Sequence, residues 1–111
     1  MARVVRRHPD FLCDLREQVA WLEEHRDVAW IEDLRHAVDE ATHAVARLPS
    51  MGALVPPAGG GRQPGKLRKL VLRRVPFVIW YAVGKGEVWF LRLFHARQQN
   101  PHPRRRARRG R

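Results

Sequence analysis

Apolar residues recur every three or four positions in two stretches of the first half of the chain. The first stretch has them at positions 11, 12, 15, 19 and 22, and the second at 31, 34, 38, 41, 45 and 48. This spacing gives a helix one apolar face, so we predict helices over residues 9–25 and 27–48. Asp27 is expected to cap the second helix, and Pro49 to end it. The short connection makes the two helices antiparallel neighbours.

The second half of the chain has the pattern of a β-sheet. Residues 67–72, 77–83 and 88–94 are rich in β-branched and aromatic side chains, which predicts three strands. Gly84, Lys85 and Gly86 predict a tight turn between the last two, and the proline and glycine content of residues 49–65 predicts a loop. Residues 4–6 suit a short edge strand. The expected fold is α+β: a short N-terminal strand, an antiparallel helical hairpin, then a three-stranded antiparallel meander (β-α-α-β-β-β), with the helices on one sheet face.

Charge divides the chain in the same place. Residues 1–48 hold 7 Arg against 10 Asp and Glu, a net of −3, whereas residues 49–111 hold 15 Lys and Arg against Glu87 alone, a net of +14. Such polarity favours an acidic partner, either nucleic acid or a carboxylate-rich protein segment. Six of the basic residues are arginines within 104–111. We therefore predict a single domain over residues 1–98 and an Arg-rich, disordered tail over 99–111.

Several classes of protein are disfavoured by the composition. The longest apolar run, residues 75–83, is far shorter than the roughly 20 residues of a membrane span, and the N-terminus lacks a signal-peptide pattern. The lone Cys13 suits a reducing compartment, so we expect a cytoplasmic protein. The histidines lack the spacing of metal ligands, and we expect neither a metal nor another cofactor. The four Trp side chains are expected to lie in the core.

The last predicted strand contains an unusual charge. Arg92 interrupts an otherwise apolar run, and His95 and Arg97 follow where the chain leaves the sheet. A charge in such a strand is costly unless it is paired or faces solvent. Two interpretations remain open: Arg92 belongs to a functional surface, or it lies solvated on the open face of the sheet.

The C-terminal strands carry a resemblance to a known family. Residues 73–83, which begin Arg-Arg-Val-Pro-Phe, are followed after a short turn by residues 88–98, which end His-Ala-Arg-Gln. This arrangement resembles the C-terminal signature of the ParE/RelE toxin superfamily, and the ParE branch matches best. The helical hairpin, Pro49 and the strand from residue 66 also follow the family's order, so the resemblance covers about residues 3–98. The loop over 49–65 is longer than usual, and the tail lies outside the pattern.

The resemblance implies a function. Members of the superfamily are toxins of type II toxin–antitoxin pairs, and each is neutralised by a cognate antitoxin. ParE-like members inhibit DNA gyrase, whereas RelE-like members cut mRNA on the ribosome. For this chain the ParE branch implies a toxin that binds gyrase, with an acidic, ParD-like antitoxin as its second partner. The residues expected to bind target or antitoxin are Arg73, Arg74, Arg92, His95 and Arg97.

Two alternatives to a gyrase-binding toxin remain open. Metal-free RNA cleavage needs an acid–base group and cations for the phosphate. A RelE-like ribonuclease would use His95 for the first, and Arg73, Arg92 and Arg97 for the second. Acid–base groups are scarce, because Tyr81 is the only Tyr and Glu87 the only carboxylate after residue 40, so a protein without catalytic residues is favoured. The other alternative is a basic domain that binds nucleic acid directly.

Overall fold

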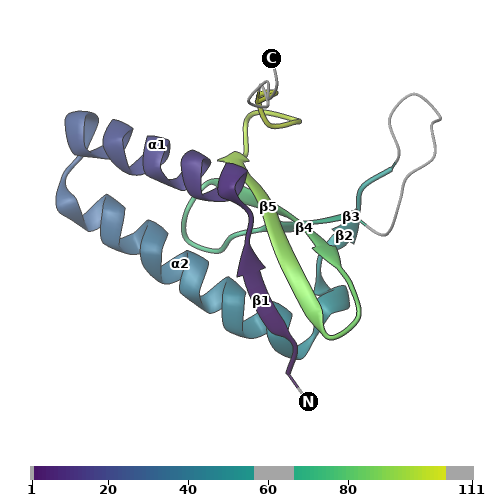
Figure 1. The fold of residues 1–111 in the computed structure, drawn as a ribbon. Helices are drawn as coiled ribbons and strands as arrows, with labels where there is room; N and C mark the ends of the chain where they lie inside the picture. The colour runs from purple at the N-terminus through teal and green to yellow at the C-terminus, as the bar shows by residue number, and fades with distance from the viewer. Residues whose placement is uncertain (1, 57–66, 105–111) are drawn as a thin grey trace.

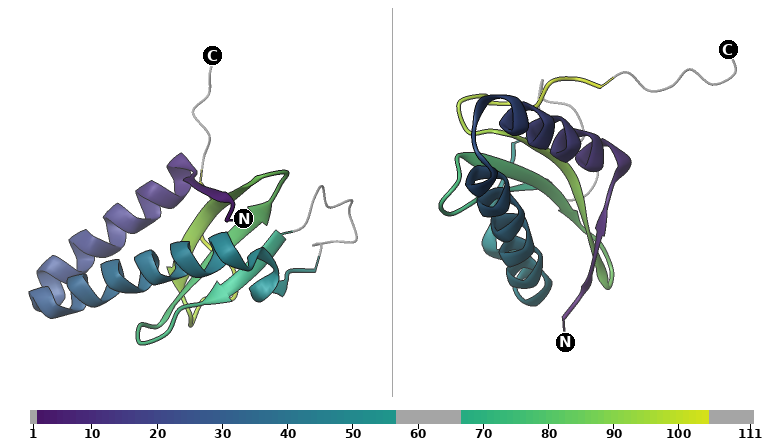
Figure 2. Two further views of the ribbon diagram at one scale, coloured as in Figure 1. Left: turned by 90° about the horizontal axis from the view of Figure 1, so that it is seen from below. Right: turned by 90° about the vertical axis from the view of Figure 1, so that its left-hand side faces the viewer.

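Two helices cover one face of a five-stranded sheet in the computed structural model, which describes residues 2–56 and 67–104 (Figure 1). The described elements are β1 (Val4–Arg7), α1 (Pro9–His25), α2 (Val28–Arg47), a 3-10 turn (Pro49–Met51), β2 (Ala53–Leu54), β3 (Leu67–Val71), β4 (Phe77–Val83) and β5 (Glu87–His95). The strand order is β1-β5-β4-β3-β2, with β1 parallel to β5 and every other pair antiparallel. Figure 2 shows the hairpin and the sheet as two separate layers.

The predicted α+β architecture is confirmed. The edge strand, the helical hairpin and the meander of β3, β4 and β5 follow in the expected order. One detail of the loop prediction is wrong, because part of residues 49–65 is regular. Ala53 and Leu54 pair with Lys69 and Arg68 as a fifth strand, too short to leave a periodic pattern in the sequence. Residues 57–66 lie outside the described part of the chain.

Both helices begin at a side-chain cap. His8 Nδ1 accepts the Asp10 N–H at 3.0 Å, and Pro9 occupies the first turn, where its missing N–H costs nothing. Asp27 Oδ1 accepts the Ala29 N–H at 3.1 Å, which confirms the predicted cap of α2. The connection between α1 and α2 is short, and the two helices lie side by side as antiparallel neighbours, as predicted.

The core lies between the helices and strands β4 and β5. Its largest fully buried side chains are Tyr81, Phe11, Phe90, Leu34, Ile79, Leu93, Val38, Val45 and Val88. They come from the apolar helix faces and from β4 and β5. In β5 the alternation shifts by one residue between Phe90 and Leu93, where the pairing with β4 has a bulge opposite Trp80 and Tyr81.

The prediction that the Trp side chains fill the core is wrong. Trp21 and Trp30 are 47% and 44% exposed, and Trp80 and Trp89 are half-buried. Trp21 and Trp30 lie near the end of the hairpin, where they line a groove together with Phe77 and His95, so both rings stay partly open to solvent. The Arg26 guanidinium lies over both rings, 5.5 and 5.3 Å from their centroids. This cation–π arrangement holds the hairpin end together.

Candidate functional site

Most of the predicted site residues lie at one end of the sheet. Arg73 and Arg74 are in the connection between β3 and β4, and His95 is the last residue of β5. His95 is paired with Phe77, the first residue of β4, and the next amide, Ala96 N–H, donates to Pro76 O at 2.8 Å. The β3–β4 connection and the exit of β5 are therefore held side by side.

Arg73 and Arg74 border a groove between α2 and β3. The groove measures about 660 Å³, and its α2 wall consists largely of small side chains, Ala37, Ala41 and Ala44. Arg74 Nη2 lies 4.0 Å from Glu40 Oε2, but both side chains are more than half exposed, so this pair contributes little to stability. Arg74 also has a positive φ of 73°, which is uncommon for a side chain of this kind.

The same groove lies beside an open strand edge. β2 pairs with β3 only at Arg68 and Lys69, and within residues 2–56 and 67–104 no strand pairs with Leu70 or Val71 on that side. Val71 is 60% exposed. An open edge of this kind can accept an added strand.

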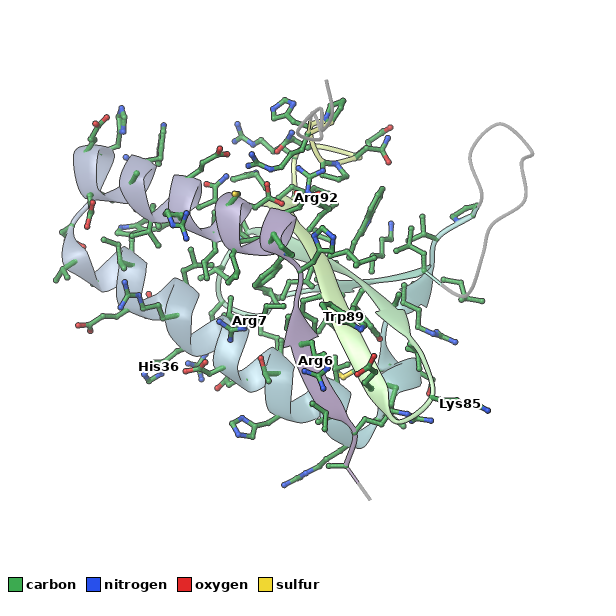
Figure 3. The ribbon with its side chains drawn as sticks, in the orientation of Figure 1. Arg6, Arg7, His36, Lys85, Trp89 and Arg92 are labelled. Atoms are coloured by element: carbon green, nitrogen blue, oxygen red, sulfur yellow. The ribbon has the colours of Figure 1, made fainter. Side chains whose placement is uncertain are left out.

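Arg92 is bound to α1 rather than free. Its Nε and Nη2 donate to the two carboxylate oxygens of Asp14 at 2.7 and 3.1 Å, and the Leu93 N–H donates to Asp14 Oδ2 at 2.9 Å. The Arg92 side chain is 14% exposed and that of Asp14 only 6%. Figure 3 shows Arg92 near the end of β5, next to α1. Asp14 thus satisfies both a charge and a backbone amide of β5 and ties the helix to the sheet.

The pKa of Asp14 reflects these contacts. Burial by itself would raise the pKa, but hydrogen bonds from Arg92, the Leu93 N–H and Arg104 outweigh it, so the pKa lies below its ordinary value of 3.8. The carboxylate is therefore ionised wherever the protein is folded near neutral pH.

The first part of the predicted tail is attached to the same carboxylate. Arg104 donates to Asp14 Oδ1 at 2.9 and 2.7 Å, and to Glu17 Oε1 at 2.6 Å. These bonds raise the pKa of Arg104. The remaining tail residues, 105–111, lie outside the described part of the chain.

His95 lies in a separate groove from the two arginines. This groove measures about 470 Å³ and is lined by Trp21, Arg26, Trp30, Phe77 and His95, among others. The His95 ring meets Phe77 edge-on at 5.4 Å, and its Nδ1 accepts the Arg97 N–H at 3.1 Å. The Arg97 side chain is exposed. Because Nδ1 of His95 accepts the Arg97 N–H, the proton of a neutral His95 ring is on Nε2, which makes Nε2 a hydrogen-bond donor.

Tyr81 has a structural role and is not available as an acid–base group. Its side chain is fully buried; the hydroxyl donates to Pro49 O at 2.7 Å and accepts the Gly52 N–H at 2.9 Å. Burial raises the pKa of the Tyr81 hydroxyl. Tyr81 therefore fastens the chain after α2 to the sheet.

Glu87 lies at the opposite end of β5 from His95. It accepts from Arg6 Nε at 2.7 Å and from Trp89 Nε1 at 2.9 Å, and the bond from Arg6 is the main cause of its lowered pKa. Figure 3 shows Arg6 on β1, next to the part of β5 that carries Trp89. Glu87 thus belongs to the pairing of β1 with β5.

The described residues hold neither a metal-binding cluster nor a helix suited to a membrane. They contain no cluster of His, Cys, Asp and Glu able to hold a metal ion. His25, His36 and His43 on the two helices are all exposed. Among the helices of residues 2–56 and 67–104, none has the length and apolar content needed to cross a membrane.

The residue missed by the sequence reasoning is Asp14. It is the one charged residue among the buried side chains of the described chain. A signal was present, because Asp14 follows Phe11 by three residues and precedes Leu15 on the apolar side of α1. A lone acid on an apolar helix face and a lone arginine in an apolar strand are natural partners.

The fold is similar to that of a solved structure. A chain of the "Chromosomal ParDE TA system from P. aeruginosa" superposes on this chain with a TM-score of 0.65 at 19% sequence identity, over 85% of this chain and 96% of that one. This chain therefore has a ParE-like fold, as the resemblance predicted. No family model and no curated protein matches the sequence.

Proposed function

We propose that this protein is the toxin of a type II toxin–antitoxin pair, that it inhibits DNA gyrase by binding, and that a cognate acidic antitoxin neutralises it. The observation that carries the proposal is the ParE-like fold, which matches a chain of a ParDE system over 96% of that chain. Fold alone does not define function, so the chemistry of the site has to agree with it.

The site chemistry supports binding over RNA cleavage. Tyr81 is buried in structural hydrogen bonds, and Glu87 lies at the far end of β5. His95 is left as the acid–base candidate, and its Nδ1 is occupied by the Arg97 N–H. A neutral His95 with this hydrogen bond presents a donor at Nε2, which suits contact with an anionic group better than removal of a proton from a 2′-hydroxyl.

The groove at Arg73 and Arg74 is our proposed antitoxin surface. It combines an apolar wall, two exposed arginines and the open edge of β3 at Val71. An extended acidic segment can add to such an edge through its backbone while its carboxylates meet the arginines. The complex is expected to weaken with salt without being lost, because the apolar wall contributes as well. A protein with these two partners would act in the cytoplasm.

Inducible expression tests the assignment. Expression of the protein alone should arrest growth, and co-expression of an adjoining acidic reading frame should restore it. The purified protein should inhibit gyrase supercoiling and leave mRNA on translating ribosomes intact. If the wild-type protein degrades mRNA, the His95→Ala variant does not, and gyrase is unaffected by either, the RelE-like alternative is correct instead.

A matched pair of variants tests the antitoxin surface. Arg73→Glu combined with Arg74→Asn removes both positive charges, and Asn tolerates the positive φ at position 74. Lys85→Glu, in the exposed turn at the opposite end of β5, is the control. Antitoxin affinity should fall in the first variant only. Equal loss in both would point to a general charge effect.

Direct binding to nucleic acid is the second alternative. Deleting residues 105–111 removes five arginines and keeps Arg104, which is bonded to Asp14. A toxin that acts through gyrase should keep its toxicity after this deletion. A basic nucleic-acid-binding domain should instead lose affinity for DNA together with much of its salt dependence.

A further inference from the structure

The groove that contains His95 lies between the end of the helical hairpin and the start of β4. Its volume of about 470 Å³ is within the range of small-molecule sites in proteins. Two of its lining residues, Leu22 and Phe77, are buried and belong to the hydrophobic core. Trp21 and Trp30 remain almost half exposed. The groove therefore has an apolar floor and two aromatic walls that are open to solvent.

Trp30 offers a flat surface for an aromatic ligand. The Arg26 guanidinium lies 5.3 Å from its ring centroid, and no other ring or cation of the described chain lies over it. Trp21, by contrast, is stacked on His25 with ring centroids 4.3 Å apart, and Arg26 lies over it as well. Since an indole has two faces, one face of Trp30 is left for stacking.

Polar groups of both charges surround these rings. Arg26 is exposed, and His95 presents an N–H at Nε2, so both can donate to an anion. Glu17 lines the groove one helical turn before Trp21. Its Oε1 accepts Arg104, whereas its Oε2 has no partner among the described residues. Donors for an anion, a carboxylate and a free aromatic face thus meet in one cavity.

We propose that this groove binds a purine nucleotide and prefers guanine. The base stacks on Trp30 through its π face, and the phosphate accepts from Arg26 and His95. Glu17 selects guanine, because guanine alone among the bases carries two adjacent N–H donors on its Watson–Crick edge, whereas a carboxylate is an acceptor only. The site goes beyond the proposed function, and nucleotide affinity can be measured whether or not the protein is a toxin.

The lining argues against two other occupants. A purely apolar ligand would leave Arg26, His95 and Glu17 without partners. A long single strand of nucleic acid needs a line of basic residues along its phosphates, but exposed Glu23 and Glu24 follow directly on α1. A mononucleotide matches the aromatic face, the donors and the carboxylate within the length of this groove.

Titrations of the full chain with mononucleotides test the proposal. GMP should bind saturably and more tightly than AMP or UMP, and guanosine, which lacks the phosphate, should bind more weakly than GMP. Trp30→Leu should weaken GMP binding at least about fivefold, which is the lower limit of what base–aromatic stacking contributes. Trp89→Phe, in the half of β5 away from this groove, is the matched control and should bind as the wild type does.

Two further variants test the polar contacts. Arg26→Gln should remove most of the difference in affinity between GMP and guanosine. Glu17→Gln should remove most of the preference for GMP over AMP. Because both side chains are exposed, unchanged thermal unfolding verifies that the fold of these two variants is intact even if Trp30→Leu is destabilised.

Four outcomes would overturn the proposal. They are no saturable binding of GMP at millimolar concentration, equal affinities of GMP, UMP and guanosine, equal affinity of Trp30→Leu and wild type for GMP, and binding confined to oligonucleotides, which would assign the groove to single-stranded nucleic acid. A protein that binds GMP in this way but leaves gyrase supercoiling unaffected would retain this site and lose the proposed function.

Discussion

Replacing Asp14 by Ala should strongly destabilise the fold. Asp14 is 6% exposed and satisfies the Arg92 guanidinium, which is 14% exposed, as well as the backbone N–H of Leu93. Without the carboxylate, a nearly buried charge and a buried amide lose their partners. Breaking such a pair from one side costs about 3–5 kcal/mol.

The lower end of that range applies here. Arg104, the second guanidinium on Asp14, is 24% exposed and can be solvated when the carboxylate is removed. We therefore expect a loss of about 3 kcal/mol in the free energy of unfolding, which corresponds to a fall of roughly 12 °C or more in Tm. Urea and thermal unfolding followed by Trp fluorescence measure both quantities.

Two variants complete this experiment. Arg92→Met in the Asp14→Ala background removes the orphaned charge and should recover a large part of the lost stability. Glu17→Ala removes an exposed carboxylate that also binds Arg104, and should change stability by less than about 0.5 kcal/mol. If Asp14→Ala has as small an effect as Glu17→Ala, or if the double variant is less stable than Asp14→Ala, then Asp14 does not balance a buried charge on Arg92.

The remaining predictions concern pH, Tyr81, Gly52 and Arg74. Folding lowers the pKa of Asp14, so the ionised carboxylate contributes its full stabilisation above the ordinary pKa of 3.8, and this contribution is lost as the pH falls through the folded pKa. The stability difference between wild type and Asp14→Asn should therefore shrink below pH 3.8 in acid titrations. A constant difference would contradict this. Tyr81→Phe should cost about 1–3 kcal/mol in urea unfolding, since the Gly52 N–H and Pro49 O lose their buried partner. Gly52→Ala should destabilise by a similar amount, about 1–3 kcal/mol, because its Cβ would lie 2.6 Å from Lys69 O and 2.8 Å from Tyr81 Oη; an unchanged Tm would be inconsistent with that contact. Arg74→Gly should raise stability by up to about 1 kcal/mol, because φ is 73° there, and a lower Tm would mean that the Arg74 side chain stabilises the turn.

The order of elements could be predicted from sequence because each had a strong local pattern. The α2 spacing from Ile31 to Leu48 and the β-branched runs of β4 and β5 specify their own secondary structure. β2 could not be predicted, since its two residues acquire their strand conformation only from pairing with Arg68 and Lys69. The positions of Trp21 and Trp30 also depended on tertiary structure, because the exposure of both rings is decided by how the end of the hairpin lies beside the start of β4.

The site was harder to predict than the fold. Arg73, Arg74, His95 and Arg97 lie at one sheet end, as the strand order implies. That Arg73 and Arg74 border one groove and His95 another depends on where the helices pass. Arg92 was expected either on a functional surface or in solvent. Its ion pair with Asp14 was not predicted, because the two residues are 78 positions apart in the sequence.

A gyrase supercoiling titration with the purified protein distinguishes a gyrase-binding toxin from both alternatives. We expect dose-dependent inhibition by the wild-type chain and by the deletion of residues 105–111, relief on adding the cognate acidic antitoxin, and no cleavage of ribosome-bound mRNA in parallel. Unimpaired supercoiling at concentrations that arrest growth would contradict it.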